Sequence, residues 1–222
     1  MAGKYYAFSP YSYCVGNPVN VVDPFGKELR TSKKYQKQFL KDIQAVFGVE
    51  KTGSFSFNND GVLQLNGNKK DFVQNLSKDQ RKVFKGLHRA MTDRQITNIV
   101  YADEQSITVN GKSKVVNIVK DFGGGVYSKE DNMIVVSPNA GSIEVTLDIP
   151  DFSNGLSFPT QTVKQNTTSV LFHEIGERNT TDTNYRGSVI DYENSARRLI
   201  KLPLRPYDLN HSNTIKTNYN QQ

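Results

Sequence analysis

The sequence contains a single cysteine and lacks any long hydrophobic run. Cys14 has no second cysteine to pair with, so an internal disulfide and a cysteine-ligated zinc site are both excluded. No apolar stretch approaches the roughly 20 residues that a membrane-spanning helix needs. The N-terminus also lacks the charged start and apolar core of a signal peptide. If the protein is exported, we expect its targeting information to lie outside this chain.

A dense stripe of lysine and arginine interleaved with aromatic residues is also missing. The formal net charge of +6 is moderate and agrees with ordinary surface solvation, so nucleic-acid binding is not indicated. With three histidines and no Gly-x-Ser-x-Gly turn, nothing specifies a Ser-His-Asp triad. The 222 residues, of which 36% are hydrophobic, predict a packed core in one substantial domain with an appendage, or in two small domains.

Residues 1–27 differ in composition from the rest of the chain. Residues 11–26, with the sequence YSYCVGNPVNVVDPFG, are dense in turn dipeptides and tyrosine. This stretch resembles the end of the RHS/YD-repeat core, where a large repeat-built shell meets a variable C-terminal domain. The resemblance implies that residues 28–222 are such a domain, often a toxin or effector, within a larger polypeptide that is secreted or displayed at the cell surface. It also implies the RHS shell and an immunity protein as partners.

Apolar spacing predicts two helices in the first half of the chain. One runs over 33–47 and ends at Gly48, and the other begins at Ser77 with Gln80 as its capping-box partner. Residues 54–57 and 62–65 flank an Asp-Gly turn and predict a hairpin. His88, among basic neighbours on the second helix, is interpreted as a helix-surface or semi-buried residue rather than a ligand.

The middle of the chain, from 96 to about 147, is rich in β-branched residues and predicts β-structure. The expected strands cover 96–101, 106–109, 114–119 and 132–136, with a tight turn at 110–111. The glycines at 123–125 lack the Gly-Lys-Ser/Thr of a phosphate loop, so a flexible crossing or a bulge is the better interpretation. Residues 148–155 predict a loop, and a helix is expected from near 162–165 through Glu177.

That last helix carries the main chemical motif. Within S169-VLFHEIG-E177, His173 and Glu177 are four residues apart and therefore project from the same helix face, with Glu174 beside them. This is the layout of the H-E-x-x-H helix of zinc peptidases, with glutamate in place of the second histidine. On this pattern His173 and Glu177 are metal ligands, and Glu174 is the general base that accepts a proton from a metal-bound water. A solvated helix face is the alternative for this motif alone.

The segment from Asp191 to Tyr207, DYENSARRLIKLPLRPY, predicts a second helix ended by a proline. It resembles the second motif of toxin and secreted-effector zincins, in which Glu-Asn-x-x-Arg precedes Leu-Pro-x-Arg and an aromatic residue. The resemblance implies that Glu193 is the third metal ligand. It also implies that the stretches around 123–127 and 133–136 form the strand beside the substrate. For Glu193, an ordinary surface acid remains the alternative.

Glu177 departs from the family pattern, which has histidine at this position. Two anionic ligands would weaken the acidification of water by zinc and would reduce selectivity against harder divalent ions. Three outcomes stay open: a working site with altered metal preference, a metal site of low activity, and a degenerate domain without metal. Further candidate residues are His211 as a substitute ligand, and Arg197, Arg205, Tyr207, Tyr185 and Arg186 as groups that orient a ligand or bind an oxyanion.

Together these observations predict an α+β fold with a small mixed or antiparallel sheet and a zincin-type C-terminal pair of active-site helices. The leading function is a zinc-dependent or other metal-dependent peptidase that acts on a protein or peptide substrate. The alternative is a catalytically degenerate domain of the same fold that serves in binding or cell-surface interaction. An effector that uses another chemistry is a third hypothesis.

Overall fold

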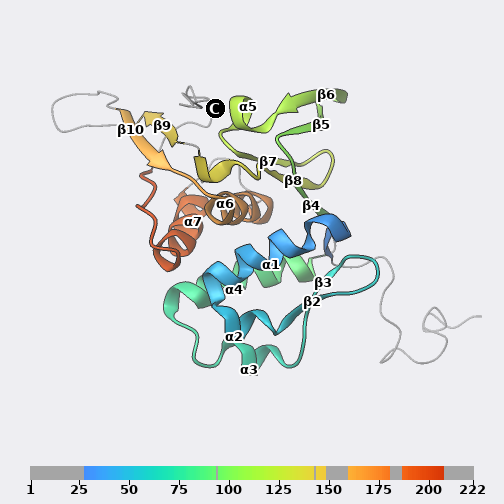
Figure 1. Cartoon of the computed structure of the whole chain (residues 1–222), viewed down its shortest axis with the longest axis vertical. Coiled ribbons are helices and arrows are strands. Elements are labelled where there is room, and N and C mark those ends of the chain that lie inside the picture. The colour runs from blue at the N-terminus through green and yellow to red at the C-terminus, as the bar shows by residue number, and fades with distance from the viewer. Residues whose placement is uncertain (1–27, 94, 143, 149–159, 181–186, 208–222) are drawn as a thin grey trace, which may run out of the picture.

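The structure is a computed structural model, and it describes residues 28–93, 95–142, 144–148, 160–180 and 187–207. The proposed RHS segment, residues 1–27, lies outside this part of the chain. The described residues form a mixed α and β arrangement in which helices pack on one face of a small sheet (Figure 1). The α+β fold class predicted from the sequence is therefore confirmed.

Short strands and helices are interspersed along the chain. The helices are α1 (Lys33–Phe47), α2 (Val49–Thr52), α3 (Lys69–Val73), α4 (Lys78–Thr92), α5 (Ile118–Phe122), α6 (Thr167–Asn179) and α7 (Gly187–Leu199), with a short 3-10 turn at Ala140–Ser142. The strands are β1 (Leu29–Thr31), β2 (Phe55–Phe57), β3 (Leu63–Leu65), β4 (Thr97–Tyr101), β5 (Glu104–Val109), β6 (Lys112–Asn117), β7 (Gly125–Ser128), β8 (Met133–Val136), β9 (Glu144–Asp148) and β10 (Thr160–Lys164).

The main sheet has four strands in the order β1-β4-β8-β7. The pairs β1–β4 and β4–β8 are parallel, whereas β7 runs antiparallel to β8 and is the strand at one edge of the sheet. Three two-stranded antiparallel sheets accompany it: β2–β3, β5–β6 and β9–β10. The sheet is therefore mixed, as the sequence predicts.

The two faces of the main sheet are covered differently, because successive side chains of a strand point to opposite faces. Ile99 and Ile134 belong to the large core formed with the helices. Their neighbours Val100 and Val135 instead pack with Ile107 of β5 in a smaller cluster under the β5–β6 hairpin. Helices α1, α4, α6 and α7 thus lie on one face of the sheet, and the hairpin covers the other together with Ile118 and Phe122 of α5.

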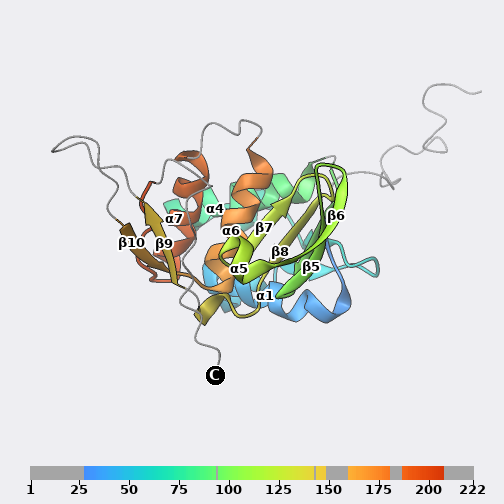
Figure 2. The same cartoon turned by 90° about the horizontal axis from the view of Figure 1, so that it is seen from above.

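Helix α6 lies at the centre of the helical layer. It contacts α1, α4 and α7 as well as strands β7 and β8, and ten of its thirteen residues are buried. Figure 2 shows it between the sheet and α7, with the β9–β10 hairpin next to α7. Two close approaches tighten this layer. Tyr192 of α7 packs against Gly86 and Gly176, where a methyl group would come within 2.4 and 3.2 Å of its ring.

Most elements predicted from local pattern are confirmed. Helix α1 has the predicted bounds, Ser77 and Gln80 form the predicted capping box of α4, and the β2–β3 hairpin turns at Asp60-Gly61. Asn110 and Gly111 both have positive φ, at 53° and 72°, in the turn between β5 and β6. Gly123 ends α5 in the left-handed conformation, so the glycines follow a helix instead of preceding one.

Three boundaries were predicted wrongly. Residues 160–164 form strand β10, paired with β9, and α6 begins only at Thr167 after the N-cap Asn166. Residues 118 and 119 belong to helix α5 rather than to the preceding strand, because Asn117 caps a new helix at that point. Helix α7 begins at Gly187, four residues before the predicted start.

Within the described residues, every helix is too short or too polar to cross a lipid bilayer, which agrees with the prediction from the sequence.

Candidate functional site

The start of α6 is fixed by reciprocal capping and by a buried acid from another helix. The Asn166 side chain accepts a hydrogen bond from the Ser169 N–H at 2.8 Å, and Ser169 Oγ accepts one from the Asn166 N–H at 3.0 Å. Asp42 of α1, 2% exposed, accepts hydrogen bonds from the hydroxyls of Thr167 and Thr168. This carboxylate stands at the positive end of the α6 dipole, so it anchors the helix that carries the motif.

His173 is the point at which the two sequence motifs meet. Its Nε2 atom lies 3.1 Å from Oε1 of Glu177, one turn further along α6, and its Nδ1 atom lies 2.8 Å from Oε2 of Glu193 on α7. The His173 and Glu193 side chains are 7% and 0% exposed, whereas Glu177 is 22% exposed. The imidazole thus has a buried carboxylate on one side and a partly accessible one on the other.

Electrostatics in this cluster favour a charged imidazole opposite a charged Glu193. Burial and the nearby Arg205 oppose protonation of His173, but the carboxylates of Glu193 and Glu177 outweigh them and raise its pKa to about 10. Burial alone would raise the pKa of Glu193, yet Arg205, His173 and Arg197 together lower it to about 2. The pair is therefore ionised across the neutral range.

Glu193 is held on its other side by arginine. Its Oε1 atom accepts a hydrogen bond of 2.6 Å from Nε of Arg197, which is four residues further along α7 and fully buried. Nη1 of Arg205 lies 3.5 Å from Oε2 of Glu193. A buried carboxylate needs such partners, because leaving its charge uncompensated away from water would be costly.

Arg205 reaches this position because the chain turns back along α7 after the helix ends. The Asn194 side chain donates to the carbonyl oxygen of Arg205 and accepts from its N–H, both at 2.8 Å. Further along, the Tyr207 hydroxyl donates to Asp191. The Glu-Asn pair thus has two roles in space: Glu193 faces His173, and Asn194 holds the returning segment 202–207.

Glu174 lies under the edge strand β7. A methyl group at Gly125 of β7 would meet Val170 Cγ1 at 2.2 Å and Glu174 Oε1 at 3.0 Å, so only glycine allows the strand to approach α6 this closely. Burial, then the charge of Glu177, raises the pKa of Glu174 to about 8. Its Oε2 atom is buried and has no hydrogen-bond partner among the described residues. This carboxyl can therefore hold or accept a proton near neutral pH.

The structure brings the four principal predicted residues together: His173, Glu174 and Glu177 on α6, and Glu193 on α7. Arg197 and Arg205 join them, while the described contact of Tyr207 is with Asp191 at the rim. Tyr185, Arg186 and His211 lie outside the described residues. Two contributors were not predicted from the sequence: Gln165, which precedes α6 and accepts a hydrogen bond from Arg197, and Asn194, which holds Arg205. The Glu-Asn-x-x-Arg spacing was the available signal for Asn194.

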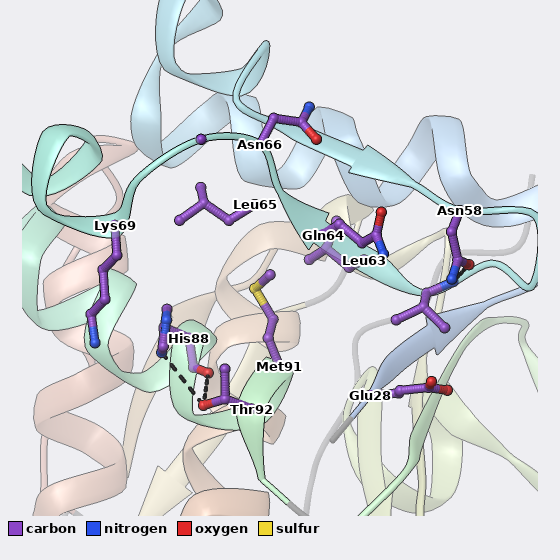
Figure 3. A pocket seen from close by; sticks show the side chains of 12 residues that line it. Glu28, Asn58, Leu63, Gln64, Leu65, Asn66, Lys69, His88, Met91 and Thr92 are labelled. Carbon is purple, nitrogen blue, oxygen red and sulfur yellow. Dashed lines mark hydrogen bonds between the residues drawn. The ribbon is translucent and has the colours of Figure 1, made fainter. Parts of the chain in front are cut away.

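His88 lies away from this cluster and is half-buried on α4. It lines a separate hollow of about 550 Å³ between β3, the start of α3 and the end of α4. Figure 3 shows Lys69 and His88 at one end of this hollow and Glu28 at the other. Burial, and the charge of Lys69, lower the pKa of His88. None of the predicted site residues within the described part of the chain lines this hollow.

The donor types in the cluster fit a divalent metal, although their positions are not those of a ready-made site. One imidazole contacts the carboxylates of Glu177 and Glu193, and Glu174 within their electrostatic reach has a buried oxygen without a described partner, which together form a donor set that zinc or a harder cation accepts. As placed, however, Glu177 and Glu193 contact opposite nitrogens of the ring. No group of three or more His, Cys, Asp or Glu side chains in the described part of the chain is arranged to hold a metal ion.

Comparisons with protein-family models, with curated proteins and with solved structures find no match to this chain, so the functional argument depends on the site itself.

Proposed function

We propose that residues 28–222 are a zincin-like, metal-dependent peptidase domain that acts as the C-terminal effector of an RHS-family protein. The observation that carries this proposal is the position of His173 between Glu177 and Glu193. Two motifs separated by a stretch of sequence meet at one imidazole, on the pair of helices that the resemblance implies.

In this proposal His173 and Glu177 bind zinc or another divalent metal. Glu193 is either the third metal ligand or the carboxylate that orients the His173 ring. A bound metal would supply a water molecule of lowered pKa and a positive charge that lowers the pKa of the neighbouring carboxyl. Glu174 accepts the proton at Oε2, the atom that has no hydrogen-bond partner among the described residues. Arg205 contributes positive charge next to Glu193 and Glu174.

The position of strand β7 supports the proposal that the substrate is a protein or peptide. It is an edge strand of the main sheet, and it passes over Glu174 at Gly125. An extended peptide can bind an edge strand through main-chain hydrogen bonds, with alternate side chains directed to the two faces. A peptide bound along β7 would lie beside Glu174 and the other cluster residues of α6 and α7.

The remainder of the proposal concerns the larger protein. It places the domain in a secreted or cell-surface polypeptide, with an RHS shell and an immunity protein as partners. The residues that support it, 11–26, lie outside the described part of the chain.

The first experiment measures metal content by elemental analysis after incubation with zinc and with manganese. We expect about one metal per chain in the wild type and loss of the metal in His173→Ala. Proteolysis of an unfolded protein substrate is then compared between wild type and Glu174→Gln. Full proteolytic activity in Glu174→Gln would rule out this residue as the base.

A second candidate is a binding domain of the same fold without catalysis. It is favoured by the ion network around Glu193, which is complete without a metal: His173 and Arg197 each contact one of its oxygens. Absence of bound metal at excess zinc and manganese would favour this candidate, provided that the protein is folded.

A further inference from the structure

We propose that Arg197 is a positioning residue that fixes the Glu193 carboxylate, and through it the His173 imidazole, in the geometry needed for the site. This inference deepens the proposed function and rests on it where metal affinity is concerned. The structural part concerns the metal-free protein and stands independently.

Arg197 is the largest fully buried side chain of the described residues, and four hydrogen bonds extend from it. Besides the bond from Nε to Glu193, Nη1 donates to the carbonyl oxygens of Lys164 and Pro203, each at 2.9 Å, and Nη2 donates to Oε1 of Gln165 at 2.7 Å. These acceptors belong to the end of β10, the residue before the α6 cap, and the segment after α7. One guanidinium therefore joins the three segments that surround the motif.

The fork shape of the guanidinium is what permits these contacts. Its N–H groups point in fixed directions within one plane, so it can serve Glu193 and three other acceptors at once. A lysine ammonium at the same position keeps the charge but has three donors on a single nitrogen, and it cannot reach all four acceptors. The geometry therefore predicts that arginine is required for more than its charge.

The consequence for the site follows from the two oxygens of Glu193. Arg197 occupies Oε1, which leaves Oε2 directed at Nδ1 of His173. With Nδ1 held, the ring orientation is set and Nε2 faces Glu177. Carboxylates that hold the far nitrogen of a metal-binding histidine change metal affinity by about 10- to 100-fold when they are lost. In this chain the carboxylate itself is held by Arg197.

Arg198 provides a matched control in the next position of the same helix. It also makes a two-point contact with a carboxylate, at 2.8 and 2.7 Å to Asp79, but its side chain is 46% exposed and faces α4. Arg197→Lys and Arg198→Lys therefore make the same chemical change, and only the first touches the cluster.

The first measurement uses NMR of the histidine ring nitrogens in metal-free protein. His88→Gln and His211→Gln variants assign the His173 signals, since the chain has three histidines. We expect a slowly exchanging Nδ1 proton on His173 in wild type and Arg198→Lys, and its loss or a marked shift in folded Arg197→Lys. Rapid exchange of that proton in the wild type would overturn the proposal even if Arg197→Lys failed to fold.

The second measurement is the dissociation constant for zinc and for manganese. We expect it to rise about 10-fold or more in Arg197→Lys and less than about 2-fold in Arg198→Lys. Unchanged affinity together with an unchanged His173 signal in folded Arg197→Lys would overturn the positioning role. If the wild type binds neither metal while the NMR result holds, the proposed peptidase function fails and the role of Arg197 remains supported.

Discussion

Asp42 of α1 accepts a hydrogen bond from the hydroxyl of Thr168 in the first turn of α6, with 2.8 Å between the two oxygens. The first turn of α6 contains no acidic residue of its own, so the charge that favours a helix N-terminus comes from a different helix. The Tyr101 hydroxyl donates to the same carboxylate at 2.6 Å, which ties α1, the sheet and α6 together at one buried group.

Asp42→Asn should therefore destabilise the domain. The substitution keeps the shape of the side chain but removes the charge and places an amide donor among hydroxyl donors, which costs about 1–3 kcal/mol in unfolding free energy. Chemical denaturation followed by far-UV circular dichroism measures the change. Asp79→Asn is the control, since Asp79 is in the first turn of α4 with a partly exposed ion pair to Arg198, worth about 0–1 kcal/mol. Equal effects of both substitutions would contradict the role of Asp42.

Gly125→Ala should disturb the site from the sheet side. Its methyl group would lie 2.2 Å from Val170 Cγ1, so either β7 or α6 must move. We expect a loss of about 1–3 kcal/mol in unfolding free energy and a weaker affinity for metal, because Glu174 lies at the same contact. Gly141→Ala is the control, since a methyl group there has nothing within 4 Å. Wild-type stability and metal affinity in Gly125→Ala would show that the strand does not approach the helix as described.

Stability of the metal-free domain should depend on pH through Glu174. Its folded-state pKa of about 8 lies above the ordinary value of 4.5, so the folded state binds a proton more tightly than the unfolded chain does. The unfolding free energy should consequently decrease as pH rises from about 4.5 through 8. Denaturation at closely spaced pH values measures this slope. Glu174→Gln should remove that part of the slope, whereas Glu104→Gln, an exposed change on β5, should leave it in place.

The ion pair of His173 and Glu193 predicts losses of stability at both alkaline and acidic pH. The folded-state pKa of His173, about 10, is raised from 6.5, so its contribution is complete below pH 6.5 and disappears as pH rises through 10. The folded-state pKa of Glu193, about 2, is lowered from 4.5, so its contribution is present above pH 4.5 and disappears as pH falls through 2. The same denaturation series with His173→Gln should show a smaller decrease between pH 6.5 and 10. An unchanged alkaline slope would be inconsistent with a charged His173.

Glu177→His should move metal preference toward zinc. Imidazole suits zinc, whereas carboxylate suits harder cations such as manganese, so the substitution replaces a hard donor by a softer one. We expect the ratio of zinc to manganese affinity to rise by about tenfold, which corresponds to about 1.4 kcal/mol. Competition titrations on both proteins measure the ratio. A ratio that stays constant would remove Glu177 from the set of metal ligands.

Local patterns in the sequence were sufficient for elements whose stability is encoded nearby. Helix α4 has its capping box and its apolar face within fifteen residues, and the β5–β6 hairpin has its Asn-Gly turn. Residues 162–164 of strand β10 were predicted to be helical, because the local sequence does not reveal that they pair with the separate strand β9. The reciprocal cap of Asn166 and Ser169 marks the true helix start. Strand β1, with three residues, depends on parallel pairing with β4 and has no local signal.

The candidate site likewise contains residues that local spacing identifies and residues that only the folded arrangement brings together. Spacing on one helix placed His173, Glu174 and Glu177 together without any knowledge of the fold. Glu193 required the resemblance of a second motif, because nothing local shows that α7 lies beside α6. The sequence suggested Arg197 as a group that orients a ligand, but its contacts with Lys164 and Pro203 could not be predicted, since these acceptors are main-chain carbonyl oxygens, which every residue possesses.

The central position of α6 has a consequence for when the domain can act during its production. Neighbours from residue 42 to residue 205 fix the cluster, and the parallel pairing of β1 with β4 joins segments far apart in the chain. Such long-range contacts form late, because the chain must close large loops before they are made. A nascent or truncated chain therefore carries the motif residues but not the assembled cluster. The cluster is complete only after Arg205 has been synthesised and has reached Glu193.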